Sequence, residues 1–185
     1  MRLFAAVDPP ADEVAALTAA LGEPLPGLRY VPSEQWHVTT AFYGEAPDRV
    51  VGELAERLGR AAGRTGPMTL VLRGAGTFPK QASKARVLWV GIEGDGDELA
   101  RLADRCVAAG RRCGLTMEGR SFRPHLTIAR ARKEPVDLRE TVDALSIFAG
   151  SPWPATTLRL VHSTLGPKVH HETIHEFPLS DPYQA

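Results

Sequence analysis

Two short segments of this chain repeat one pattern, and this pattern limits how the chain can fold. Residues 125–130 read His-Leu-Thr-Ile-Ala-Arg, and residues 37–42 read His-Val-Thr-Thr-Ala-Phe. In a β-strand, residues two apart project from the same face. His125 and Thr127 therefore share one face of a predicted strand, and the apolar Leu126 lies on the other face. The repetition predicts two strands that each turn one face toward a core and the other toward a cleft.

The chain has 6 histidines, and four of them begin a His-x-Thr triplet. The triplets at His37 and His125 have an apolar middle residue and an alanine two residues after the threonine. The triplets at His162 and His171 lack both features. A bare triplet occurs easily by chance. We therefore expect the first two triplets to be functional and the other two to be structural.

The predicted elements alternate between helices and strands. Asp8 can cap a first helix that Gly22 ends, because both are favoured at those positions. Further helices are predicted over 47–63, 94–113 and 135–145, and strands over 2–8, 29–43, 67–78, 86–92, 122–130, 156–162 and 173–179. Each half of the chain contains one His-x-Thr strand. We expect an α+β fold: one domain over 1–185, made by internal duplication of two lobes, whose mixed or antiparallel sheets face a central cleft with helices outside.

Length and charge narrow the classes of protein to consider. A chain of 185 residues with a formal net charge of zero can bury a substantial core and has no global attraction for nucleic acid. Binding of RNA would need a local basic patch. No stretch approaches the roughly 20 apolar residues of a membrane span, and residues 1–8 are too short for a signal sequence. We expect no membrane partner, and a monomer.

The two cysteines give a prediction about the cellular compartment. Cys106 and Cys113 lie seven residues apart in a predicted helix, where they would be separated by about 10 Å, too far for a disulfide. We expect them to pack as small apolar side chains in a reducing cytoplasm.

Two histidines across a small substrate can supply a general base and a general acid, since the ordinary pKa of histidine is about 6.5. Cleavage of a phosphodiester needs this pair, one group to activate water and the other to protonate the leaving oxygen. The hydroxyls of Thr39 and Thr127 can donate to phosphate oxygens as charge develops there. An arginine adds a planar donor group suited to phosphate. The candidate arginines are Arg120, Arg123 and Arg130.

A metal site is the less favoured interpretation. Neither motif has a carboxylate or a cysteine at ligand spacing, and threonine is a poor ligand for zinc. His170, His171 and His175 could bind a metal weakly, but a surface strand that bears histidines is the favoured explanation for them. We expect no metal and no cofactor.

The doubled motif, together with segments 2–8, 86–91, 122–130 and 176–179, resembles the two-histidine (2H) phosphoesterases. Within this superfamily the chain resembles the bacterial and archaeal RNA 2′,3′-cyclic phosphodiesterases, historically named 2′-5′ RNA ligases. The resemblance implies a bilobal fold and metal-free hydrolysis of a 2′,3′-cyclic phosphate to a 2′-phosphate. It implies that His37 is the acid for the departing 3′ oxygen and His125 the base for water. Thr39, Thr127 and Arg130 would bind the phosphate.

Two features depart from this expectation. Arg130 lies five residues after His125, so strict alternation points it to the opposite face unless the strand ends, twists or bulges. The family usually has a tyrosine where this chain has His171.

Three functions stay open on the sequence. The first is a cyclic phosphodiesterase that acts on RNA ends or on small cyclic nucleotides. The second is RNA 2′-5′ end-joining by the reverse reaction; the chain shows no phosphate-binding loop and no nucleotide-binding lysine motif for an energy-coupled ligase. The third is a non-catalytic RNA-binding module that retains the cleft.

Overall fold

The computed structural model describes residues 1–119, 121–166 and 169–180. Within these ranges the chain is α+β. The helices are α1 (Ala11–Leu21), α2 (Asp48–Ala62), α3 (Gly96–Arg112) and α4 (Arg139–Leu145). The strands are β1 (Arg2–Val7), β2 (Leu28–Tyr30), β3 (Val38–Glu45), β4 (Met68–Phe78), β5 (Val87–Gly94), β6 (His125–Ala131), β7 (Trp153–Ala155), β8 (Thr157–Thr164) and β9 (His170–Pro178). Two short 3₁₀ turns span Ser33–Gln35 and Ala82–Lys84.

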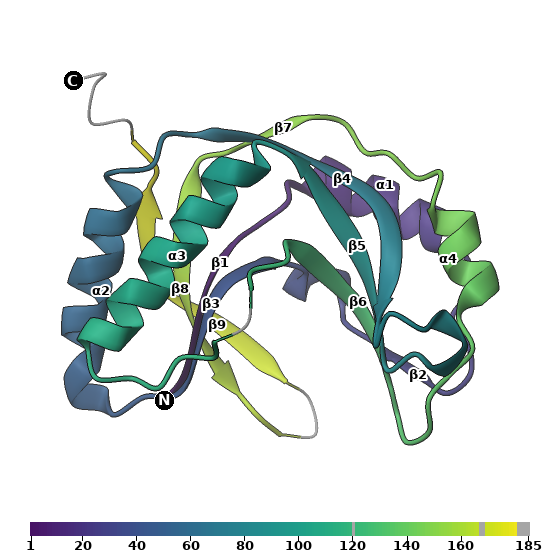
Figure 1. Cartoon of the computed structure of the whole chain (residues 1–185), viewed down its shortest axis with the longest axis horizontal. Coiled ribbons are helices and arrows are strands. Elements are labelled where there is room, and N and C mark those ends of the chain that lie inside the picture. The colour runs from purple at the N-terminus through teal and green to yellow at the C-terminus, as the bar shows by residue number, and fades with distance from the viewer. Residues whose placement is uncertain (120, 167–168, 181–185) are drawn as a thin grey trace.

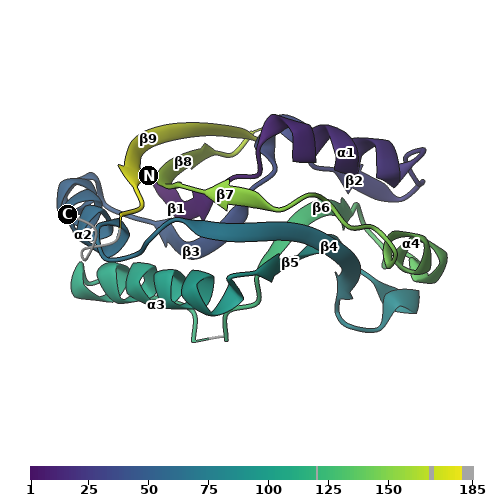
Figure 2. The same cartoon turned by 90° about the horizontal axis from the view of Figure 1, so that it is seen from above.

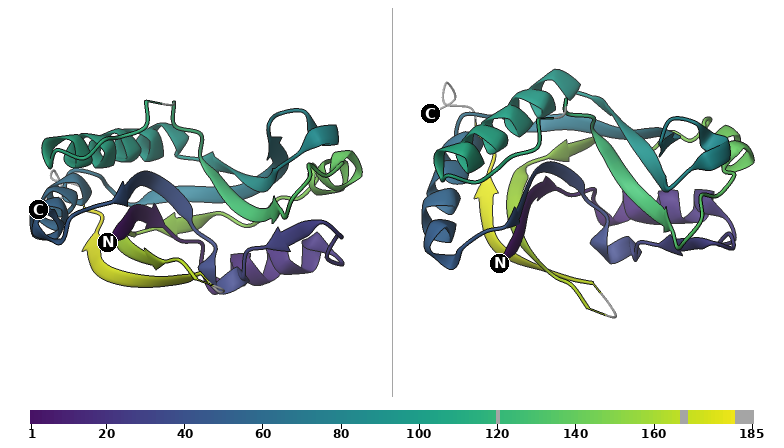
Figure 3. Two further views of the ribbon diagram at one scale, coloured as in Figure 1. Left: turned by 90° about the horizontal axis from the view of Figure 1, so that it is seen from below. Right: turned by 60° about the horizontal axis from the view of Figure 1, so that its bottom comes forward.

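The strands of the described ranges form one curled, antiparallel sheet. The strand order is β7-β4-β5-β6-β3-β1-β8-β9, and β2 pairs with β6 beside β3. Helices α2 and α3 pack together toward one end of the molecule, and α1 and α4 lie toward the other (Figures 1 and 2). Figure 3 shows the curl of the sheet from two further directions. This order puts β3 and β6, the strands that carry the motifs, next to each other in the middle of the sheet.

The two faces of the sheet carry different hydrophobic clusters. Leu3, Ala5 and Val7 of β1 belong to the main core, which the fully buried leucines of α2 and α3 share. Phe4 and Ala6 point the other way and form a small separate cluster with Val161 of β8. We call the side of the sheet that carries this second cluster the open face. Burial of the main core supplies the driving force for folding, so the open face is free to carry polar groups.

Two sequence predictions about the fold need correction. The described residues do not form two sheets that face each other: their strands join in a single sheet, because β3 pairs directly with β6. Asp8 does not cap the first helix; Pro10 stands at that position, and the Asp8 carboxylate forms an ion pair with Arg159 of β8. The α+β class is confirmed, while the internal duplication and the division into two lobes stay predictions.

The cysteines lie where the sequence predicted. Cys106 is a buried free thiol in α3, and Cys113 is a free thiol at the end of that helix. Among the described residues, no helix has the length and apolar character needed to cross a membrane.

Candidate active site

Strands β3 and β6 carry the two motifs side by side. Val38 pairs with Leu126 in antiparallel register, and both side chains are fully buried in the main core. Neighbouring residues of a strand project from opposite faces, so the motif side chains that flank this pair lie on the open face: His37, Thr39, His125 and Thr127. Continuing the register by one residue sets each histidine opposite the threonine of the other motif. The structure therefore brings both motifs together within one sheet, as neighbours.

Each motif strand contains a β-bulge directly after its threonine. The register of β3 against β1 skips Thr40, and the register of β6 against β5 skips Ile128. A bulge shifts the alternation of faces by one residue. Ile128 and Ala129 are consequently both buried, and Arg130 returns to the face that carries His125. The strict alternation of the sequence pattern is broken at this bulge.

The two motif histidines make the same hydrogen bond. Nδ1 of His37 lies 2.7 Å from the carbonyl oxygen of Gln35, and Nδ1 of His125 lies 2.7 Å from the carbonyl oxygen of Arg123. A carbonyl oxygen only accepts, so each Nδ1 carries the proton and donates it. In the neutral ring, Nε2 then keeps its lone pair. Both rings are held with Nε2 as the atom that can take up or release a proton.

His37 lies against the second hydrophobic cluster. Its ring stacks on that of Phe4, with centroids 4.5 Å apart and an interplanar angle of 22°. Burial lowers the pKa of His37 from 6.5 to about 4, and the positive charges of His171 and Arg159 add to this lowering. The hydrogen bond to Gln35 acts in the opposite direction. His37 is therefore neutral at neutral pH in the unliganded protein.

His125 lies between aromatic rings and an arginine. Its ring meets that of Phe78 edge-on at 5.1 Å, and the Trp89 ring lies 6.2 Å away. Burial lowers the pKa of His125; the hydrogen bond to the Arg123 carbonyl raises it, and the charge of Arg130 lowers it further. The bulge at Ile128, which places both side chains on one face, brings the Arg130 charge to the side of His125. The two histidines thus have different neighbours: Phe4, His171 and Arg159 for His37, and Phe78, Trp89 and Arg130 for His125.

His171 also belongs to the site, although its triplet was expected to have only a structural role. Its ring lies edge-on to His37 at 5.4 Å and edge-on to Phe4 at 5.0 Å. Burial lowers its pKa, and the charges of His170 and Arg159 lower it further. The signal was present, since His171 begins a His-x-Thr triplet in a strand. The charged middle residue Glu172 made that triplet look unlike the other two.

A network of polar side chains supports this side of the site. Arg159 of β8 forms an ion pair with Asp8 and donates a hydrogen bond of 2.9 Å to the hydroxyl of Thr173. Burial raises the pKa of Asp8, and the charge of Arg159 opposes that rise. Asp8 thus compensates the charge of Arg159. These residues join the end of β1 to β8 and β9 beside His37.

A hollow of about 220 Å³ lies next to His37. Its walls come from β1, from the turn before β3 and from β8 and β9. The lining residues are Phe4, Glu34, Gln35, His37, Arg159, Val161, His170, His171 and Thr173. A small polar ligand could therefore reach His37 from the side of β9.

Comparison with known proteins identifies the family. The family model described as the 2′-5′ RNA ligase superfamily matches residues 6–167 of this chain. The chain belongs to this superfamily. One relative of this chain is the RNA 2′,3′-cyclic phosphodiesterase of Aeropyrum pernix. The two sequences are 36% identical over 141 residues, which cover 75% of this chain and 78% of that protein. The RNA 2′,3′-cyclic phosphodiesterase of Geobacillus stearothermophilus is 32% identical over 163 residues, 84% of this chain but only 49% of that protein, so this chain spans about half its length.

A solved structure of similar fold is that of the protein TT0787 from Thermus thermophilus. It superimposes on this superfamily member with a TM-score of 0.81 at 28% sequence identity, covering 98% of this chain and all of that one. The resemblance predicted from the doubled motif is confirmed at the level of family and fold.

The other candidate residues of this superfamily member have simpler surroundings. Arg123 is exposed, and its carbonyl oxygen orients His125. Arg120 lies outside the described residues. His170 and His175 are exposed, and among the residues that the structure describes no three His, Cys, Asp or Glu side chains gather as metal ligands. The absence of a metal stays a prediction.

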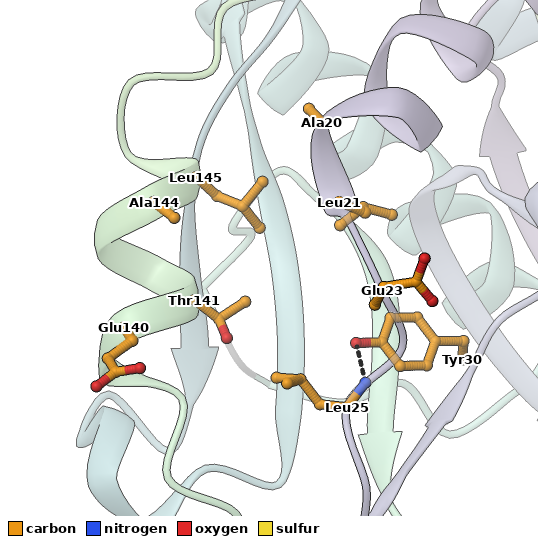
Figure 4. A pocket seen from close by; sticks show the side chains of 9 residues that line it. All are labelled: Ala20, Leu21, Glu23, Leu25, Tyr30, Glu140, Thr141, Ala144 and Leu145. Carbon is orange, nitrogen blue, oxygen red and sulfur yellow. Dashed lines mark hydrogen bonds between the residues drawn. The ribbon is translucent and has the colours of Figure 1, made fainter.

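A second hollow of about 220 Å³ lies away from the motifs, between the end of α1 and α4 (Figure 4). At the edge of this hollow, the Tyr30 hydroxyl accepts a hydrogen bond of 3.2 Å from the Leu25 backbone N–H. The hollow is lined by Ala20, Leu21, Glu23, Leu25, Tyr30, Glu140, Thr141, Ala144 and Leu145. None of the motif side chains borders it, so it is not part of the candidate active site.

Proposed function

We propose that this superfamily member hydrolyses 2′,3′-cyclic phosphates at RNA ends to 2′-phosphates, without a metal or cofactor, with His37 and His125 as acid and base. One observation carries the proposal: two histidines on neighbouring strands, each with Nδ1 bound to a backbone carbonyl and Nε2 left for proton transfer. The names of the relatives from Aeropyrum pernix and Geobacillus stearothermophilus support the choice of substrate.

The proposed reaction is an in-line attack of water on the cyclic phosphorus. His125 Nε2 removes a proton from the water, whose oxygen forms the new bond to phosphorus. The bond between phosphorus and the 3′ oxygen breaks, and His37 gives that oxygen a proton. Each of these proton transfers contributes about 10² to 10⁴ in rate. The product is a 2′-phosphate with a free 3′ hydroxyl, and the two histidines exchange states in each cycle.

The acid role requires His37 to bind a proton before the reaction. A pKa of about 4 leaves the unliganded ring neutral at neutral pH. A phosphate anion beside the ring favours the charged imidazolium and raises this pKa. Thr39, Thr127 and Arg130 on the same face would donate to the non-bridging oxygens, where negative charge increases in the transition state.

Two alternative functions, RNA binding without catalysis and 2′-5′ end-joining, are tested with the same wild-type protein and histidine variants. An RNA-binding module would keep affinity for RNA without turnover. In 2′-5′ end-joining the 5′ hydroxyl of a second RNA would take the place of water: its oxygen would form the new bond to phosphorus while the bond to the 3′ oxygen breaks. A small cyclic nucleotide could replace the RNA end as substrate. We propose that the chain acts as a monomer in the cytoplasm.

The test is incubation of the purified protein in EDTA with 2′,3′-cyclic AMP and with a short RNA that ends in a cyclic phosphate. A 2′-phosphate product is expected. His37→Ala and His125→Ala should each lower turnover at least about 10²-fold. His162→Ala is the matched control, because His162 begins a triplet outside the site. Turnover that survives both motif substitutions, or that needs added metal, would contradict the proposal.

A further inference from the structure

Two arginines stand directly opposite each other where β2 meets β6. Arg29 pairs with Arg130 in antiparallel register, and the side chains of such a pair project from the same face with Cβ atoms about 5 Å apart. Burial lowers the pKa of Arg130, and the charge of Arg29 lowers it further. Like charges at this position destabilise a sheet. The protein therefore tolerates an unfavourable pair of charges beside the motif.

No acidic residue of the described ranges forms an ion pair that would relieve this repulsion. Among the described residues, neither Arg29 nor Arg130 forms an ion pair with a carboxylate, whereas Arg159 on the other side of the site is paired with Asp8. The neighbouring Arg132 donates a hydrogen bond of 3.1 Å from its Nε to the carbonyl oxygen of Leu28. The open face is consequently asymmetric, with compensated charge beside His37 and uncompensated positive charge beyond His125.

The bulge at Ile128 decides where this charge points. Because it returns Arg130 to the open face, the directly opposed Arg29 lies on that face as well. In the neighbouring strand β5, Val87 pairs with Arg130 and Trp89 pairs with Thr127. The partners of Arg130 and Thr127 are thus two residues apart in β5. Two residues of strand span about 7 Å, a length that one nucleotide can bridge. Arg130 and the directly opposed Arg29 thus both lie about one nucleotide's length along β6 from Thr127.

We propose that Arg29 binds the phosphodiester that joins the terminal nucleotide of the RNA to the one before it. This inference rests on the proposed function and adds the direction of the RNA: the chain runs from the histidines along β6 toward β2. Arg130 lies between the two phosphates and faces both. A phosphodiester there removes the Arg29–Arg130 repulsion, since two cations share one anion. Substrates with at least one internal phosphodiester are therefore preferred over mononucleotides.

The test compares two dinucleotides that both end in a 2′,3′-cyclic phosphate. One has a normal phosphodiester between its nucleosides, and the other has an uncharged methylphosphonate there. The wild-type protein should prefer the phosphodiester about tenfold in kcat/KM, the effect of one charge-assisted contact. Arg29→Gln should reduce this preference severalfold, because only Arg130 would then face the phosphodiester. Arg111→Gln is the matched control, because Arg111 is exposed at the end of α3, and it should leave the preference at the wild-type value.

Each other outcome has a defined meaning. A wild-type protein without the preference, or an Arg29→Gln variant that retains it, would overturn the inference. An equal loss with both dinucleotides would also overturn it, because a structural role of Arg29 does not distinguish the two linkages. Calorimetric binding of the corresponding 2′-phosphate dinucleotides gives the same comparison without turnover. Absence of turnover with a retained, Arg29-dependent binding preference would overturn the proposed function and leave the phosphodiester site standing.

Discussion

Val38 pairs with Leu126, and each of these residues directly follows a motif histidine. The two motifs therefore meet through equivalent residues, and each places its histidine opposite the threonine of the other. A substrate on this face meets the same donor and acceptor groups from both strands. The surroundings of the strands break this symmetry: Phe4 and His171 border His37, whereas Phe78, Trp89 and Arg130 border His125.

A better leaving group should separate the acid from the base. If sulfur replaces the 3′ oxygen of the cyclic substrate, the departing thiolate needs little help from a proton, since thiols are far more acidic than alcohols. The loss caused by His37→Ala should then fall below about tenfold, while His125→Ala should still cost about 10² to 10⁴. Product formation measured by chromatography decides this. The opposite pattern would assign the acid to His125.

Acid should destabilise the fold through His37. Its pKa is about 4 in the folded protein and 6.5 ordinarily. The unfolded chain therefore binds a proton first as the pH falls, and stability is lost from pH 6.5 down to pH 4. The loss from His37 reaches about 2 kcal/mol at pH 5.

Urea denaturation at pH 7 and pH 5 measures this effect. His37→Phe can still stack on Phe4 and does not titrate, so its free energy of unfolding should fall about 2 kcal/mol less than that of the wild-type protein between the two pH values. Equal losses in the two proteins would show that His37 binds protons equally well when folded.

Replacement of His171 should show whether its ring or its proton matters. His171→Ala removes the edge contacts with Phe4 and His37, which are worth about 0.5–1.5 kcal/mol and so about two- to tenfold in kcat. His171→Phe and His171→Tyr keep an aromatic ring and should retain kcat within about threefold. The outcome that would contradict this is a rate for both aromatic variants as low as that of His171→Ala, which would indicate a role in proton transfer. The pH profile of kcat/KM, measured for the same variants, provides the control.

A methyl group at Gly76 should disturb the site from the β4 side. A Cβ at this position would overlap the ring of Trp89, which lies near His125. We expect Gly76→Ala to lower kcat/KM at least about tenfold, because the displaced ring moves the histidine it borders. Gly52→Ala in α2 is the control, since nothing lies within 4 Å of the added methyl. That variant should keep its activity and gain about 0.5–1 kcal/mol in stability. Full activity in Gly76→Ala would show that Trp89 does not position His125.

The alternation of residues in the motif was sufficient to predict the local structure. His125 and Thr127 share a face with Leu126 opposite, because the pleat of a strand depends only on its own residues. Other local rules, the end signals of helices and the rise of a helix per residue, predicted the helices and the free cysteines. The family resemblance that rested on these motifs is confirmed by the match over residues 6–167.

Pairing between distant strands decided the rest. Thr40 and Ile128 are extra residues only relative to the registers of β1 and β5, so no pattern within the motif could show that Arg130 shares the face of His125. His171 joins the site because β9 pairs with β8 and β8 with β1. The order of amino acids is enough to predict which side chains share a face of a regular, unbulged stretch of strand, since that is a local property of the backbone. Which faces meet follows from the folded arrangement alone, because register and bulges depend on contacts between residues far apart in the chain.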